Sequence, residues 1–191
     1  MPENAQPGST ENWSAALRYI AGRKSAEESL GFLAHISTTI QQTAEPEEVV
    51  PAVARACVPF LASAVSVGAP ATHSQLVVQS PTEYSSALEA VRGLLAEAGA
   101  DKLVISEHEG LLKKSDPGHL SLLSQWRATS AVALPLAYRG VRGGHLVVLR
   151  GEGHRRGPIS PGDLALVSEV ADRVAAFNAF ATQPAGSDAR R

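Results

Sequence analysis

The chain has 191 residues, of which 44% are hydrophobic and 19% charged, and its formal net charge is −2. This composition is typical of one globular domain with tails, and the near-neutral charge excludes the basic footprint of a nucleic-acid-binding protein. Cys57 is the only cysteine, which excludes an intrachain disulfide and multi-cysteine zinc or redox motifs. Neither a signal peptide nor an apolar run of membrane length is evident, so we expect a cytoplasmic protein without membrane or nucleic-acid partners.

Two helices are predicted near the N-terminus, after a tail. Residues 1–10 have no apolar period and are expected to be disordered. Thr10 is placed to cap a short helix that ends near Gly22. Ser25, with Glu28 three residues later, has the spacing of a capping box and predicts the start of a longer helix.

The middle of the chain alternates between helix and strand signals. A third helix is expected to open at Glu45, and Pro59 is expected to kink or end it near Phe60. Beyond it the predicted elements are strands over 64–68 and 76–79 around a turn at 69–74, a helix over 82–98, a strand over 102–106 and a short helix over 117–126.

The strongest local pattern is a hairpin over 130–151. Two apolar runs, 130–138 and 144–149, flank a short turn rich in Arg and Gly. Both faces of each run are apolar, which indicates the middle of a sheet covered on each side by helices. A final helix is predicted to open at Ser160-Pro161 with Asp163 in its first turn, and residues 183–191 are expected to be a disordered tail.

These elements predict an α+β fold with a central antiparallel sheet of about five or six strands and helices on both faces. The expected division is a tail and short helix over 1–24, one domain over 25–182 and the C-terminal tail.

The hairpin carries a family resemblance. The run SAVALPLAYRG, followed by Gly144 and LVVL, resembles the GAF domain, a small-molecule sensor module of bacterial signalling proteins. The last helix and the segment FLAHISTTIQQTAEPEEVVPAVARACVPFLASAVSV are similar to the family's closing and opening elements, so the resemblance covers 26–182. The version looks closest to sensor domains that accompany PP2C-type phosphatases or histidine kinases. The resemblance implies a GAF/PAS-like fold and a role in signal transduction.

Three specialised classes of the family do not fit the sequence. The asparagine–lysine–aspartate signature of cyclic-nucleotide-binding members is absent. Bilin-carrying members have a Cys-His pair, whereas Cys57 is followed by Val58. Free methionine sulfoxide reductases of this fold need several cysteines. No cofactor is therefore predicted, and the small-molecule ligand stays unnamed.

The resemblance implies a ligand cavity between the sheet and the helices on its second face. Polar and aromatic candidates converging there are Tyr84, Ser106, His108, Trp126 and Ser130. Such a set suits a small, partly aromatic ligand held by few hydrogen bonds. The plainer alternative is that Trp126 fills the core and that Ser106 and His108 begin a surface loop.

Other candidate sites are weaker. The acidic and histidine residues at 107–109 and His119 match no tight metal-ligand motif. A basic rim is also expected, either solvated or facing an acidic partner surface, from Arg150, His154, Arg155 and Arg156 with Arg139 and Arg142 in the hairpin turn. Cys57 is expected to be a buried apolar residue. The sequence shows no nucleophile elbow and no triad spacing, so no catalytic residue and no enzyme activity are predicted.

The terminal helices indicate an interface. They offer more apolar surface than is needed to cover one sheet. The family often dimerises through these helices. The candidate interface residues are Trp13, Leu17, Ile20, Phe177 and Phe180. We therefore expect a non-catalytic sensor domain, homodimeric or bound to a signalling partner, that signals through its terminal helices. Two alternatives remain open: a dimerisation or docking module with a filled cavity, and an enzyme that has recruited the cavity.

Overall fold

A computed structural model describes residues 8–68, 76–79, 82–98 and 102–181. The elements are, in chain order, α1 Gly8–Gln42, α2 Pro46–Cys57, β1 Ala64–Gly68, β2 Leu76–Gln79, the 3-10 turn η1 Thr82–Tyr84, α3 Ser85–Ala98, β3 Leu103–Ser106, α4 Glu109–Leu112, α5 Pro117–Gln125, β4 Ala128–Tyr138, β5 Val141–Gly151 and α6 Pro161–Ala181. The predicted turn at 69–74 and the tail at 183–191 lie outside the described residues, as does the N-terminal tail before Gly8.

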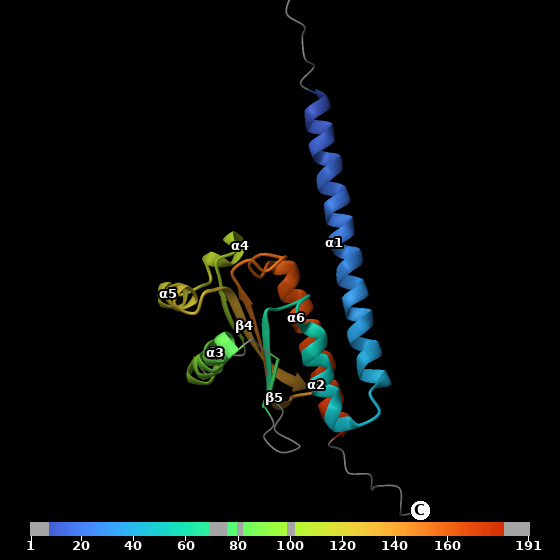
Figure 1. Cartoon of the computed structure of the whole chain (residues 1–191), viewed down its shortest axis with the longest axis vertical. Helices are drawn as coiled ribbons and strands as arrows, with labels where there is room; N and C mark the ends of the chain where they lie inside the picture. Colours follow the sequence, from blue (N-terminus) through green and yellow to red (C-terminus); the bar gives the residue numbers. More distant parts are fainter. Residues whose placement is uncertain (1–7, 69–75, 80–81, 99–101, 182–191) are drawn as a thin grey trace, which may run out of the picture.

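The predicted hairpin forms the centre of the sheet. The five strands pair antiparallel in the order β2-β1-β5-β4-β3 (Figure 1). Arg139 and Gly140, between the paired residues Tyr138 and Val141, both have positive φ, 49° and 80°. A two-residue loop of this kind matches the right-handed twist of the flanking strands, and glycine enters it without strain.

Helices cover both faces of the sheet, as the two-sided apolar hairpin predicts. One set of alternate strand residues, such as Val132 and Leu134, packs in a core with α1, α2 and α6. The other set, such as Ala131 and Ala133, packs in a second core with α3 and α5. Figure 1 shows α3 and α5 on one side of the sheet and α2 and α6 on the other, with α1 outside α2 and α6. The α+β class with helices on both faces is confirmed.

The prediction of two N-terminal helices is wrong, because α1 is one continuous helix of 35 residues. Gly22 lies in its interior, where a glycine costs only about 1 kcal/mol relative to alanine. The capping-box spacing at Ser25 is not used: the Ser25 carbonyl accepts the Ser29 hydroxyl at 2.8 Å within the helix. The expected tail over 1–10 is also too long, since helical residues begin at Gly8.

Two further differences are local. The helix that opens after Glu45 ends at Cys57, before Pro59, because proline has no N–H for the helical ladder. The polar segment after β3 contains the short helix α4, which the sequence pattern does not predict. The His108 imidazole accepts the Gly110 N–H at 3.2 Å and caps it.

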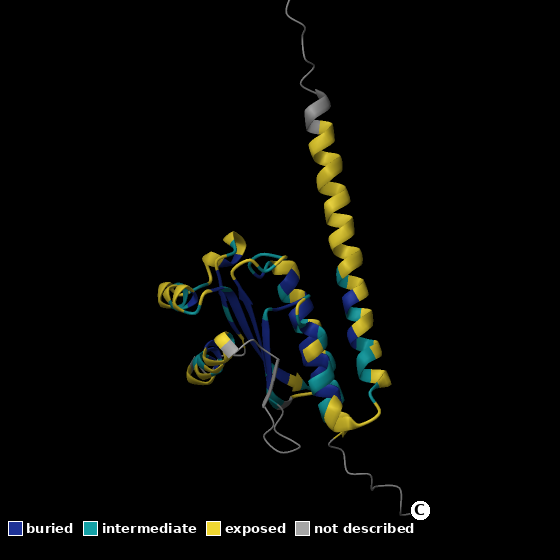
Figure 2. Ribbon diagram, viewed as in Figure 1, coloured by how far each residue is buried: buried dark blue, intermediate teal, exposed yellow. Residues whose placement is uncertain are grey.

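Much of α1 extends away from the domain. All residues from Asn12 to Glu28 are exposed, and the first side chain buried against the domain is Phe32 (Figure 2). Of the helices in the described part of the chain, none combines the length and apolarity needed to cross a membrane.

Candidate functional site

The sheet separates four of the five predicted ligand residues into two pairs, and the fifth, His108, follows β3. Ser106 pairs with Ser130 across β3 and β4, so the two side chains share a face, the one that carries Val132 and packs against α6. Tyr84 and Trp126 pack instead in the core beneath α3 and α5. These two pairs lie on opposite faces of the sheet and therefore cannot line the same pocket.

Ser106 and Ser130 hold the segment that leads into α6. The Ser130 hydroxyl accepts the Ile159 N–H at 2.9 Å, and the Ser106 hydroxyl donates to the Ile159 carbonyl at 3.2 Å. The Ser106 hydroxyl also accepts the His108 N–H at 3.1 Å. Both serines are fully buried. Within the described part of the chain, these hydrogen bonds of the Ser106 and Ser130 hydroxyls all go to backbone groups and hold the fold together.

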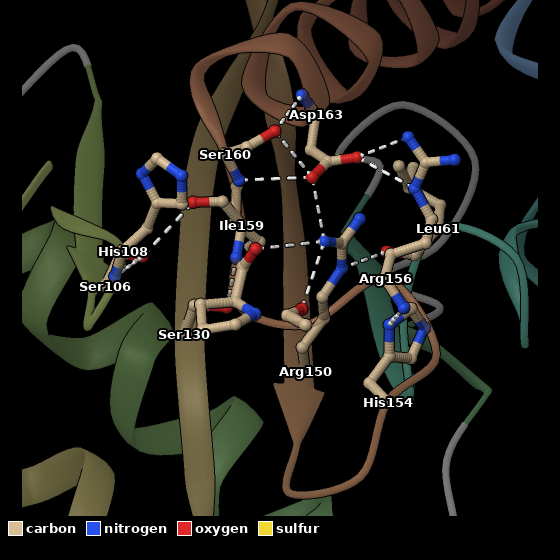
Figure 3. Close-up of polar contacts among 12 residues, drawn as sticks. Leu61, Ser106, His108, Ser130, Arg150, His154, Arg156, Ile159, Ser160 and Asp163 are labelled. Carbon is tan, nitrogen blue, oxygen red and sulfur yellow. Dashed lines mark hydrogen bonds and ion pairs between the residues drawn. The ribbon is translucent and has the colours of Figure 1, made fainter. Parts of the chain in front are cut away.

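A buried ion-pair network continues this polar row onto β5 (Figure 3). Arg150 pairs with Ser130 in the sheet and is fully buried, so the prediction of a solvated arginine is wrong. Its guanidinium donates to the Leu61 carbonyl at 2.9 Å and to the Asp163 carboxylate at 2.9 Å. Strand β5 places Arg150 opposite the first turn of α6. The alternation of apolar and polar residues along the strand does not predict this contact.

Asp163 is the anion of the network, and with Ser160 it forms a capping box at the start of α6. Its carboxylate accepts the Ser160 N–H at 3.1 Å, while the Ser160 hydroxyl accepts the Asp163 N–H at 3.1 Å. Burial alone raises the pKa of this carboxyl, but the Arg150 guanidinium and the Ser160 donors outweigh burial. The pKa of Asp163 therefore lies well below its ordinary value of 3.8, and the carboxylate stays charged.

The network reaches α1 through Arg156. The Arg156 guanidinium donates to Asp163 at 2.9 Å and lies 4.0 Å from the Glu28 carboxylate. It also lies over the Phe60 ring, 4.9 Å from the centroid, and Phe60 stacks on Phe32 of α1 at 4.6 Å. These contacts fix the point where α1 leaves the domain.

The opposite face of the sheet contains an unsatisfied buried hydroxyl. Ser66 pairs with Val147, and Val147 belongs to the core beneath α3. Ser66 is fully buried, and its hydroxyl has no hydrogen-bond partner among the described residues. A buried polar group without a partner is rare in a native protein. Ser66 is therefore the group on this face that calls most for a ligand or an ordered water.

A second polar group lies at one end of the same face. His145 is two residues from Val147 on β5, and its ring covers Gly68, where a Cβ would meet the ring at 3.3 Å. The Arg92 guanidinium of α3 donates to His145 Nε2 at 2.7 Å and pairs with Glu89 at 2.7 Å. Burial and the Arg92 charge lower the pKa of His145, which keeps the imidazole neutral with its proton on Nδ1.

Tyr84 and Trp126 close the other end of that face. The Tyr84 hydroxyl lies where a Cβ on residue 151 would stand, so glycine at that position lets the ring reach the end of β5. Trp126 is half-buried just before β4. Their packing agrees with the plainer prediction that Trp126 fills the core, and their role in ligand binding stays a prediction.

The remaining sequence candidates have structural environments. His108 is half-buried and caps α4. In the part of the chain that the structure describes, no three His, Cys, Asp or Glu side chains are grouped as metal ligands. Cys57 is fully buried, and burial raises the pKa of its thiol to about 12, so it packs as an apolar residue.

The predicted interface residues lie at opposite ends of the helical layer. Trp13, Leu17 and Ile20 on α1 are 70%, 61% and 60% exposed. Phe180 is 57% exposed and contacts Tyr138, whereas Phe177 packs against the core. The α1 and α6 helices run parallel, since Arg156 precedes α6 beside Glu28 and Arg173 lies beside Ser37.

Sequence reasoning did not single out Ser66 and Arg92 as site residues. A lone hydroxyl in the apolar strand AVSVG is the signal that was available for Ser66. Arg92 has no such signal, because its contact with His145 joins residues 53 positions apart.

Comparisons with known proteins agree on the fold. No family model matches the sequence, and no curated protein matches it. Among solved structures, the GAF domain of a putative sensor histidine kinase from Pseudomonas syringae pv. tomato is 16% identical, with a TM-score of 0.56 over 85% of this chain and 95% of that one. The GAF domain of a phosphoenolpyruvate-protein phosphotransferase from Coxiella burnetii is 18% identical, with a TM-score of 0.54 over 82% and 95%.

A third solved structure, a far-red absorbing dark state with bound biliverdin, is 14% identical and has a TM-score of 0.53 over 80% of this chain and 99% of that one. Each of the three similarities covers at least 80% of this chain. This chain has the GAF-domain fold.

Proposed function

We propose that this chain is a non-catalytic regulatory domain that binds a small molecule on the α3 side of its sheet. Occupancy of that side is passed to a partner through α1 and α6. Support for the proposal comes from the fold, which is shared with a sensor-kinase GAF domain and with a biliverdin-bound protein. The single observation that carries it is the unpartnered hydroxyl of Ser66.

The chemistry of the α3 side defines the kind of ligand. On this face Ala64 is the next residue along β1 from Ser66, and Ala131 and Ala133 lie on β4, beyond Leu149 and Val147 of β5. A compact, largely apolar ligand next to them needs one polar atom to satisfy Ser66. Arg92 and His145 offer further donors at one end of the face. This combination favours an aromatic or heterocyclic metabolite with one or two acceptor groups.

Ligand occupancy can reach α1 and α6 because these helices are linked to residues of the strands beneath the proposed site. A ligand changes the signalling state only if it binds one arrangement of α1 and α6 more tightly than another. The strands beneath the proposed site are also the strands that hold Arg150 and Ser130 on the other face. A shift of β4 relative to β5 therefore reaches Asp163, Arg156 and α1.

The test combines ligand discovery with a variant. Native mass spectrometry of the purified protein and thermal shift against a metabolite panel identify the ligand, which at 100 times Kd adds about 2.7 kcal/mol of stability. Ser66→Ala removes an unsatisfied hydroxyl, so we expect the ligand-free variant to gain about 1–3 kcal/mol and to lose most of the ligand-induced shift.

Ser168→Ala is the matched control, because the Ser168 hydroxyl is already bonded to the Leu164 carbonyl at 3.0 Å. It is expected to keep the ligand-induced shift and to gain no stability. A full ligand shift in Ser66→Ala, or a wild type that shifts with no compound and carries none, contradicts the proposal.

The exposed apolar residues of α1 favour a second candidate function, a dimerisation or docking module whose core is filled by its own side chains. It becomes the better description if no compound shifts the wild type while Leu17→Glu dissociates a dimer in light scattering.

A further inference from the structure

The free side of α1 carries a row of exposed residues at heptad spacing, of which Trp13, Leu17, Ile20 and Ala34 are apolar. Its a and d positions are all exposed, and we call them the α1 seam: Trp13, Leu17, Ile20, Lys24, Glu27, Gly31, Ala34 and Thr38. In the same heptad numbering, the buried residues Phe32 and Ile36 occupy b and f positions. Those positions lie on the opposite side of the helix from a and d. The α1 seam therefore points away from the domain.

The residues of the seam are arranged asymmetrically along the helix. Large apolar side chains occupy its first part, and small side chains, Gly31 and Ala34, occupy its last part. A Cβ at position 31 would meet nothing within 4 Å, so open space surrounds that position in a single chain. Two opposite charges, Lys24 and Glu27, lie between the two parts.

A parallel pair of α1 helices is unfavourable for this pattern. It places each seam residue against its own copy, so Lys24 meets the partner's Lys24 and Glu27 meets the partner's Glu27. Both layers then bring like charges together, which costs several kcal/mol in an interface.

An antiparallel pair satisfies the whole seam in one register. Each a residue then meets a d residue of the other helix, and Lys24 lies against the partner's Glu27, twice by symmetry. In the same register Leu17 meets the partner's Ala34, and Ile20 meets the partner's Gly31. Large side chains thus face small ones at each of these layers, and the centre contains two opposite-charge pairs.

We propose that two copies of this chain pair through an antiparallel α1–α1 coiled coil in this register. The overlap from residue 13 to residue 38 is about 40 Å long. Each projecting half of α1 then lies along the docked half of the partner's α1, and the two domains sit at opposite ends on the outer sides. The inference deepens the proposed function, because it names the partner of α1.

Charge variants test the central layers. Lys24→Glu places two acidic side chains in both layers, so we expect its dimer dissociation constant to rise at least about tenfold in sedimentation or light scattering. Adding Glu27→Lys to the same chain restores opposite charges and is expected to restore the wild-type constant. In a parallel dimer neither change matters, because every layer is like-charged before and after.

Two controls separate other causes. Lys113→Glu makes the same charge change at an exposed residue at the end of α4, outside α1, and is expected to leave the dimer unchanged. Arg23→Gln removes the exposed pair within the helix between Arg23 and Glu27, at 2.8 Å, without changing any seam residue. It too is expected to keep the wild-type dissociation constant to within about threefold, as the median worth of exposed pairs implies.

Cysteine cross-linking tests the orientation directly. Cys57 is fully buried, so an introduced cysteine is the reactive one in each variant. Leu17→Cys and Ala34→Cys are prepared separately in the full chain. The antiparallel register predicts a disulfide dimer when the two variants are mixed, and none from either alone, because like positions then lie about 25 Å apart. Ala26→Cys, exposed but off the seam, controls for random collisions.

Each outcome decides the proposal. Cross-linking only in the mixture supports it. Cross-linking of each separate variant, with none of Ala26→Cys, shows a parallel pair and overturns it, as does a wild type that stays monomeric at all concentrations. Equal cross-linking in every sample, Ala26→Cys included, also overturns the register. No ligand enters these measurements, so their failure leaves ligand binding at Ser66 unaffected, and a silent metabolite panel leaves the dimer unaffected.

Discussion

At the scale of single residues, the molecule treats its two buried polar groups on β1 and β5 in opposite ways. Arg150 is fully buried, and its guanidinium donates to the Leu61 carbonyl and the Asp163 carboxylate. Ser66 is equally buried, and its hydroxyl has no partner among the described residues. The paired Nε and Nη1 atoms of Arg150 fix structure, although its Nη2 has no partner among the described residues. The Ser66 hydroxyl makes no hydrogen bond to those residues and favours whatever supplies one. This contrast separates the structural side of the sheet from the proposed binding side.

Removing the anion of the network should be strongly destabilising. Asp163→Asn leaves the buried Arg150 guanidinium without its counter-charge, so we expect a loss of about 3–5 kcal/mol in unfolding free energy. Denaturant unfolding followed by circular dichroism measures the change. Glu169→Gln is the control, because it removes an exposed pair with Arg173 at 2.6 Å and should cost less than about 1 kcal/mol. Similar losses in the two variants would show that the buried pair has no special weight.

At the scale of elements, α1 shows how a weak stop signal fails. Gly22 is exposed in the helix, and a Cβ there would meet nothing within 4 Å. Gly22→Ala should therefore stabilise the projecting half of α1 by about 0.5–1 kcal/mol. Hydrogen exchange of the amides around position 22 should slow, with no change in the amides of α3. Unchanged exchange around residue 22 would mean that glycine is not what limits this part of the helix.

At the scale of the whole molecule, three buried or half-buried groups link stability to pH in the same direction. The pKa values of His145 and His154 lie below the ordinary 6.5, and that of Asp163 lies below 3.8. In each case the unfolded chain takes up a proton first as the pH falls. Their stabilising contributions are therefore complete above the unfolded pKa and are lost below it.

The expected unfolding free energy decreases below about pH 6.5 as the histidines titrate in the unfolded chain, and again below about pH 4 through Asp163. Chemical unfolding from pH 8 to pH 3 checks both ranges. Asp163→Asn should remove only the decrease in unfolding free energy below about pH 4. A wild-type curve parallel to that of the variant below pH 4 would contradict the assignment to Asp163.

The α+β class, the central hairpin and the helices on both faces followed from the sequence alone, because apolar periodicity and turn residues are local properties. The single helix α1 did not, since tertiary contacts at Phe32 and Ile36 and good helix formers override one glycine. The same local reasoning grouped Ser106 and Ser130 with Tyr84 and Trp126, although the sheet lies between the two pairs.

Only the tertiary structure decided which polar residues are structural. Arg150 reads in the sequence as one of several arginines near a glycine-rich loop, and its burial depends on Asp163 meeting it from another element. Ser66 and the contact of Arg92 with His145 depend likewise on strand register and on how α3 lies across the sheet. Strand register and helix packing bring together residues far apart in the chain. The hydrophobic period of one segment does not determine which distant residues it will contact.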